Sequence, residues 1–150
     1  SYVFVKKRTS PMHKNGHDLI LPLVILILKT LCGRINTATT MMKLTTKKIE
    51  EGFMSHPLKS QDGQGFDAKV IVKYFNPCGS GTWLITEAEK QEDGDWLLFG
   101  YIHIHEWEWG YVLLSELLNL RLPFGMTIER DIYSLARTIR EHLKCFGITD

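Results

Sequence analysis

The chain has 150 residues, 44% of them hydrophobic and 23% charged, with a formal net charge of +1 at pH 7. This length and balance favour one globular domain and exclude two large ones. Residues 1–41 carry six Lys or Arg against one acidic residue, a charge of +5, whereas residues 42–150 carry twelve against sixteen, a charge of −4. Because phosphate contacts need clustered basic side chains, the acidic body disfavours nucleic acid as a partner.

The three cysteines, Cys32, Cys78 and Cys145, lie far apart and form no Cys-x-x-Cys pair. They predict neither a disulfide framework nor a zinc ribbon, and their isolation is typical of thiols in a reducing cytoplasm. A reactive thiol needs a basic neighbour, and Cys78 has none beside it in the sequence. We therefore expect a cytoplasmic protein without a cofactor.

Residues 19–28 form an uninterrupted apolar run behind a basic cluster, an order that resembles a secretory signal. A run of ten residues is shorter than the ~20 that span a bilayer as a helix, so no membrane span is expected. Met41 and Met42 precede a polar segment that reads as the start of a small cytosolic protein. We expect residues 1–41 to be a leader or extension, with secretion as a minor alternative, and residues 42–150 to form one α+β domain.

The body begins with a short helix and a hairpin. Residues 45–51 predict an amphipathic helix, with Thr45 or Thr46 as N-cap and Gly52 as its end. Segments 68–75 and 82–87 are rich in β-branched and aromatic residues and flank a Pro/Gly turn. They predict two strands that pair antiparallel.

Two further strands and two helices follow. Segment 96–105 has apolar residues at both parities, which predicts a strand covered on both faces. A strand at 110–114 precedes a short helix through Leu120, with Ser115 as its cap. A final helix is predicted from the N-cap Thr127 to just before Gly147. Its apolar residues at helical spacing are Ile128, Ile132, Leu135, Ala136, Ile139 and Leu143.

This order predicts an α+β fold: a mainly antiparallel four-stranded sheet with a C-terminal amphipathic helix and short helices packed against it. A body of ~110 residues buries about two-thirds of its unfolded surface and needs no metal or disulfide to fold.

Four motif blocks give the body a recognisable signature: GTWLITE at 81–87, DWLLFGY at 95–101, WEWGYVLLSEL at 107–117 and PFGMTIERDIY at 123–133. In order and spacing they resemble the bacterial family known as domain of unknown function 2958, over residues 42–133. The resemblance implies a small cytosolic protein of plasmids, phages and integrated elements. It implies no established reaction, cofactor or substrate.

Two histidines, His103 and His105, fall on one face of a predicted strand, because strand side chains alternate with a period of two. This spacing suits two ligands of one metal ion. A third ligand would have to come from elsewhere in the chain, for example His56, Asp95 or Glu116. We favour the simpler interpretation of polar residues at a half-exposed strand end, and the family resemblance gives the histidines no role.

The body holds four tryptophans, at positions 83, 96, 107 and 109. Such residues are most often core, but an indole also offers a flat apolar face to a peptide, base or sugar. Trp107 and Trp109 share one strand face. We predict a binding surface made by Trp107, Trp109, Glu108 and Arg130.

Glu129, Arg130 and Asp131 stand at the predicted start of the last helix, where capping and a structural ion pair explain all three. A catalytic role would require Glu129 or Asp131 to meet Glu87 or Glu116 in one pocket, as paired carboxylates. The sequence contains no nucleophile elbow, phosphate loop or dinucleotide fingerprint.

We therefore expect a non-enzymatic accessory protein that binds another macromolecule, with a protein as the favoured partner. The alternatives are a small hydrolytic or metal-assisted enzyme that uses these carboxylates or histidines, and a nucleic-acid-associated protein that uses residues 1–41. The sequence does not indicate an oligomeric state.

Overall fold

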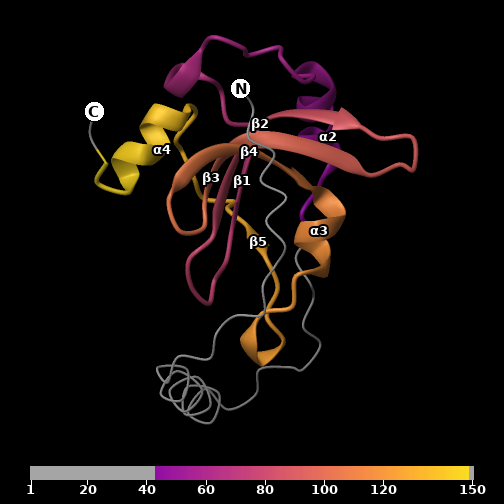
Figure 1. The fold of residues 1–150 in the computed structure, drawn as a ribbon, viewed down its shortest axis with the longest axis vertical. Coiled ribbons are helices and arrows are strands. Elements are labelled where there is room, and N and C mark those ends of the chain that lie inside the picture. Colours follow the sequence, from indigo (N-terminus) through magenta and orange to yellow (C-terminus); the bar gives the residue numbers. More distant parts are fainter. Residues whose placement is uncertain (1–42, 149–150) are drawn as a thin grey trace. The chain divides into compact units, whose positions relative to one another are not determined.

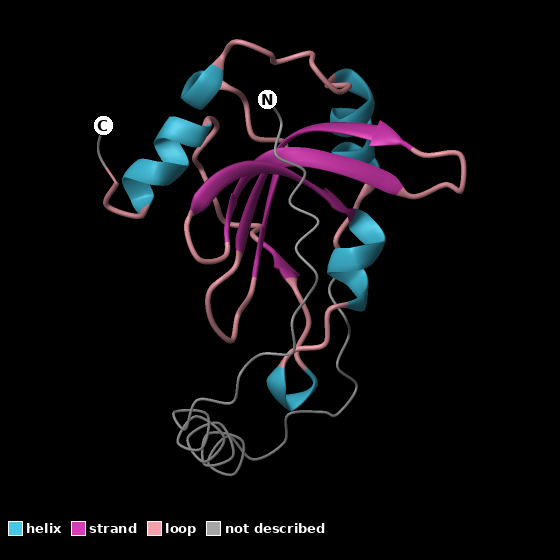
Figure 2. Ribbon diagram, viewed as in Figure 1, coloured by secondary structure: helices cyan, strands magenta, loops and turns pink. Residues whose placement is uncertain are grey.

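The computed structural model describes residues 43–148, so the predicted leader at 1–41 lies outside the described residues. The predicted α+β fold is confirmed, with an antiparallel sheet in the strand order β4-β3-β2-β1-β5 (Figures 1 and 2). The strands are β1 (Val72–Phe75), β2 (Thr82–Lys90), β3 (Trp96–His103), β4 (Trp107–Leu113) and β5 (Glu129–Arg130). The helices are α2 (Lys47–Ser55), η1 (Gly65–Asp67), α3 (Leu114–Asn119), η2 (Pro123–Gly125) and α4 (Ile139–Cys145), of which η1 and η2 are 3-10 helices.

The described sheet has five strands where the sequence predicted four. The additional strand, β5, pairs antiparallel with β1, so that Tyr74 faces Arg130 and Phe75 faces Glu129. These residues were predicted to open the last helix. Tertiary pairing with β1 overrides the local helical spacing there.

The C-terminal helix is confirmed, but it begins at Ile139 and not near Ile128. Its N-cap is Thr138, whose hydroxyl accepts the N–H of Glu141. Before it, the carboxylate of Asp131 accepts the backbone N–H groups of Tyr133 and Ser134, and residues 131–138 form no helix. The first half of the predicted helix was therefore wrong.

Helix α2 begins as predicted, with the Thr46 hydroxyl accepting the N–H of Ile49. It continues beyond Gly52 to Ser55, so the prediction that Gly52 ends the helix was wrong. A Cβ at Gly52 would lie 2.7 Å from Cγ2 of Ile71. The glycine is thus present for close packing and not as a helix stop.

Helix α3 begins at Leu114, one residue before the predicted cap. The carboxylate of Glu116 accepts the N–H of Leu113, which satisfies a donor of the first turn. Ser115 instead donates its hydroxyl to Asp95, which also accepts the N–H of Trp96. Asp95 therefore joins the start of α3 to the start of β3.

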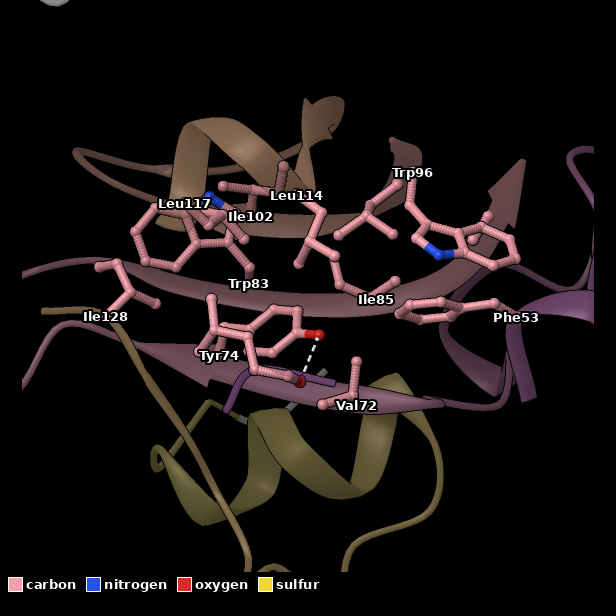
Figure 3. Packing of buried hydrophobic residues seen from close by; sticks show 13 residues of the cluster. Phe53, Val72, Tyr74, Trp83, Ile85, Trp96, Ile102, Leu114, Leu117 and Ile128 are labelled. Atoms are coloured by element: carbon pink, nitrogen blue, oxygen red, sulfur yellow. Dashed lines mark hydrogen bonds between the residues drawn. The ribbon is translucent and has the colours of Figure 1, made fainter. Parts of the chain in front are cut away.

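The main hydrophobic core lies on the sheet face that carries α2 and α3 (Figure 3). Phe53 of α2 packs against Trp96, with ring centroids 5.2 Å apart. The hydroxyl of buried Tyr74 donates to the carbonyl of Leu44 at 2.9 Å, and burial raises the pKa of Tyr74. Trp83 and Trp96 belong to this core, as is most common for tryptophan residues.

A smaller cluster lies on the opposite face, where Leu84 of β2 is buried with Ala68 and with Ile139 and Leu143 of α4. Strand β2 is consequently buried on both faces along most of its length. In strand β3, buried residues alternate with half-buried ones. The prediction that both faces of this strand are covered is therefore only partly correct for β3, and it is β2 that has two covered faces.

A β-bulge in β2 decides which side chains reach this second face. Ile85 pairs with Gly100, but the next register pair is Glu87 with Phe99, so Thr86 is the inserted residue. In a regular strand Glu87 would share the core face of Ile85. The bulge moves its carboxylate to the opposite face.

His142 gives a testable pH dependence. Its side chain is buried, and burial, followed by the positive charge of Lys73, lowers its pKa, whereas Asp131 and Glu141 act in the opposite direction. A lowered pKa means that the unfolded state binds the proton more tightly than the folded state does. The contribution of His142 to the free energy of unfolding is therefore fully present above pH ~6.5 and decreases as the pH falls below that value. The free energy of unfolding of the wild type should decrease between pH 7 and pH 5.

In His142→Gln the free energy of unfolding should decrease less between pH 7 and pH 5, because glutamine does not titrate. This expectation concerns the pH dependence and does not depend on the stability of the variant at pH 7. His105→Gln, at an exposed position in the turn after β3, serves as the control. Urea titrations at several pH values measure both. An unchanged slope in His142→Gln would show that other groups cause the acid sensitivity.

Candidate functional site

Six aromatic rings from β3 and β4 line one face of the sheet. The register pairs Phe99 with Tyr111, Tyr101 with Trp109 and His103 with Trp107, and residues directly opposite in antiparallel strands present their side chains to the same face. We call these six half-buried residues the aromatic row.

The rings of the aromatic row contact one another in sequence. The centroid distances are 4.8 Å from Tyr111 to Phe99, 5.6 Å from Phe99 to Trp109 and 5.0 Å from Trp109 to Tyr101. The row continues at 5.2 Å from Tyr101 to Trp107 and 5.0 Å from Trp107 to His103. All five lie in the range in which aromatic pairs attract beyond simple burial, so the row is held as one surface.

Two further rings cover part of the row. Phe66, in η1, contacts Tyr101 with centroids 5.3 Å apart, and Phe146, which follows α4, contacts Trp107 at 5.5 Å. Two hollows lie beside the aromatic row, one at each of its ends.

The larger hollow, of about 590 Å³, lies between the 59–65 loop and one end of the aromatic row. We call it the acidic hollow. Its aromatic wall is made by Phe99, Trp109 and Tyr111. The remaining lining residues are Lys59, Gln61, Asp62, Gly63, Gly65, Ala68, Thr86 and Glu87.

Glu87 fastens the 59–65 loop to the sheet. Its carboxylate accepts the backbone N–H groups of Lys59 at 2.7 Å and of Gln61 at 2.8 Å, and the residue is 4% exposed. Lys59 has a left-handed φ of 69°, which is uncommon for lysine and is held here by this contact. Within residues 43–148 no Lys or Arg forms an ion pair with Glu87.

Gln61 holds the same loop from within. Its side-chain amide donates to the carbonyls of Lys69 at 2.9 Å and Thr86 at 2.6 Å, and its oxygen accepts the N–H of Lys69 at 2.6 Å. The loop and the bulge in β2 are therefore joined through one buried side chain.

The electrostatic character of the acidic hollow is visible at Tyr111. Burial raises the pKa of its hydroxyl first, and the negative charges of Glu87, Asp62 and Glu89 raise it further. The negative charges of three carboxylates are thus felt at Tyr111, which lines the acidic hollow.

The second hollow, of about 460 Å³, lies at the other end of the row, beside the turn between β1 and β2. His103, Trp107 and Phe146 line it together with Lys73. The ammonium group of Lys73 is 2.8 Å from the carboxylate of Asp131 and 5.2 Å from the ring centroid of Phe146. Its charge is therefore already compensated within the fold.

Of the predicted binding residues, the structure places Trp107 and Trp109 together in the aromatic row. Glu108 faces Ile102, a core residue, and so lies on the opposite face of β4. Arg130 lies in β5, at the far edge of the sheet from β4. The four residues do not form the common surface that the sequence suggested.

The two histidines are placed differently from each other. Strand β3 ends at His103, which contacts Trp107, whereas His105 lies exposed in the turn that follows. The prediction that both share a strand face was wrong, because the chain turns between them. In the described part of the chain, no group of three or more His, Cys, Asp or Glu side chains is positioned to hold a metal ion.

The four candidate catalytic carboxylates lie on separate elements. Glu116 caps α3, Asp131 pairs with Lys73 and accepts two backbone N–H groups, and Glu129 lies in β5. Among these four residues, only Glu87 lines one of the two hollows. Three of the carboxylates already have a structural partner.

Several residues of the site were missed in the sequence, namely Phe99, Tyr101, Tyr111, Gln61 and Asp62. The aromatic residues had a detectable signal, because they occupy alternate positions in two adjacent strands. The polar residues had none, since their role depends on contacts between segments far apart in the chain.

These features define a small α+β domain with an aromatic face between two hollows. The family described as protein of unknown function, DUF2958, matches residues 44–145, and the chain belongs to this family. No curated protein and no solved structure matches the chain. Between residues 43 and 148 the structure contains no helix with the length and apolar character needed to cross a membrane.

Proposed function

We propose that this protein is a non-enzymatic module that binds another protein through the aromatic row. The observation that carries the proposal is the row itself: six rings in continuous contact, each half-exposed on one sheet face. Protein interfaces are enriched in Tyr, Trp and Phe, and buried aromatic residues there often contribute most of the binding energy.

The position of β4 supports the proposal. It is an edge strand of the described sheet, with β3 as its neighbour, and it carries Trp107, Trp109 and Tyr111. A partner that approaches this edge meets aromatic side chains together with backbone groups of β4 that no strand within residues 43–148 pairs.

The arrangement of charged groups favours binding over catalysis. Glu116 and Asp131 serve the fold on other elements, and Glu87 anchors a loop. The acidic hollow also repels phosphate groups, which disfavours nucleic acid as the occupant of this face. The proposal includes an accessory role in a plasmid, phage or integrated element, and a cytoplasmic location, both suggested by the family resemblance.

A site-specific photo-crosslinker tests the proposal. With benzoylphenylalanine in place of Trp109, we expect a covalent adduct with a partner protein in cells that carry the native gene. The matched control places the same group at Glu108, on the opposite face of the same strand, where no such adduct is expected.

The identified partner is then purified and titrated against the wild type and Trp109→Ala. Loss of an interface tryptophan typically costs about 2 kcal/mol or more, so the dissociation constant should rise by about 30-fold or more. Circular dichroism checks that the variant is folded. Equal crosslinking at both positions, or an unchanged dissociation constant for folded Trp109→Ala, would contradict the proposal.

A further inference from the structure

We infer that the acidic hollow receives a basic side chain of the partner protein, and that arginine fits it best. This inference rests on the proposed function and specifies the chemistry of the partner at one end of the aromatic row.

The wall offers flat apolar surfaces to a cation. Phe99 and Trp109 are stacked at an interplanar angle of 15°, and Tyr111 is inclined to Phe99 by 47°. Cations are attracted to the faces of aromatic rings, most strongly to tryptophan. A guanidinium group is planar and weakly hydrated, so it stacks on such rings more readily than an ammonium group does.

Glu87 supplies a fixed negative charge beside this wall. Its register partner is Phe99, and its carboxylate accepts one backbone N–H on each oxygen. A carboxylate has about four acceptor sites, so both oxygens retain capacity for another donor. Because two loop amides hold the group in place, an arriving guanidinium would meet an already oriented acceptor.

The surroundings leave the hollow with an excess of negative charge. Glu87, Asp62 and Glu89 all act on the Tyr111 ring, and residues 42–150 carry four more acidic than basic residues. Lys59 also lines the hollow, but it contacts Glu87 through its backbone N–H and its side chain is exposed. The complementary occupant is therefore cationic.

A blocked Gly-Arg-Gly tripeptide serves as the probe, and its isosteric, neutral citrulline analogue is the control. Nuclear magnetic resonance titration follows the indole N–H signal of Trp109, assigned from the Trp109→Phe variant, in the full-length protein. We expect a saturable shift with the arginine peptide, weakened by added salt, and an affinity for the citrulline peptide lower by about tenfold or more. The lysine peptide should bind more weakly than arginine.

Two variants remove charge from the hollow. Glu87→Gln should lower the affinity for the arginine peptide by about tenfold, which is the loss expected when a charge-assisted hydrogen bond is removed. Since Glu87 also anchors the loop, Asp62→Asn provides a second test at an exposed position, with an expected weakening of about threefold by loss of charge attraction. Glu108→Gln, on the opposite face, should bind the arginine peptide as the wild type does.

Equal affinity for the arginine and citrulline peptides, or wild-type affinity in both folded charge variants, would overturn the inference. If Trp109 crosslinks to a partner under those circumstances, the proposed function stands and only the basic side chain is excluded. If the arginine peptide binds as expected but no partner crosslinks, the chemistry of the hollow stands and the proposed function fails.

Discussion

Gly100→Ala is expected to destabilise the domain by about 3 kcal/mol or more, above the usual range for an overpacked site. A Cβ at this position would lie 2.0 Å from the carbonyl oxygen of Leu84 and 2.9 Å from the Cα of Ile85. Both atoms belong to the backbone of the adjacent strand and cannot rotate away. Strand β2 would have to move, and the bulge with it.

Gly110→Ala provides a matched control, because Gly110 is the register partner of Gly100. A Cβ there would lie 3.6 Å from Cδ1 of Ile102, an ordinary contact. Thermal denaturation of both variants should show a fall in melting temperature of more than about 10 °C for Gly100→Ala and little change for Gly110→Ala. Similar melting temperatures would mean that the sheet accommodates the extra methyl group.

The second large effect is expected from Gln61→Glu. The substitution preserves shape but removes the amide that donates to the carbonyls of Lys69 and Thr86. A carboxylate would face two carbonyl oxygens, and leaving buried polar groups unsatisfied costs about 1–3 kcal/mol each. We expect a loss of about 2–4 kcal/mol and faster amide exchange in the 59–65 loop.

Gln64→Glu makes the same chemical change in the same loop, at an exposed position. It should leave stability within about 0.5 kcal/mol of the wild type. Urea denaturation gives the free energies, and hydrogen exchange reports on the loop. If Gln61→Glu matched its control, the loop would be held by Glu87 alone.

The sequence predicted the central strands well because their local signals agree with their tertiary setting. Segments 82–87 and 96–105 are rich in β-branched or aromatic residues and became β2 and β3 with small changes at their ends. The start of α2 was also predictable from the Thr46 cap. These features depend on neighbours in the chain.

The C-terminal region was predicted less well because two local signals compete. Apolar spacing from Ile128 favoured one long helix, although Leu135 is 94% exposed in the structure. The pattern Thr138-x-x-Glu141 is a helix-start signature and marks the true beginning of α4. Pairing of β5 with β1 is a long-range contact that spacing within one segment cannot reveal.

The candidate site was predictable only where it follows strand periodicity. Trp107 and Trp109 were identified on that basis. Placement of Glu87 beside Phe99 depends on the bulge in β2. The sequence signal for this bulge is Gly100, an isolated glycine in the neighbouring strand β3. The side-chain contacts of Gln61 join residues up to 25 positions apart and have no local signature.

The bulge also sets a condition for engineering this domain. If β2 kept Thr86 but paired with β3 without the bulge, Glu87 would face Leu98 and share the face of Ile85 and α2. An unpaired carboxylate would enter the main core, while the 59–65 loop would lose its anchor. Transfer of this β2 sequence to another antiparallel sheet therefore requires that the bulge at Thr86 is preserved, as well as the aromatic side chains.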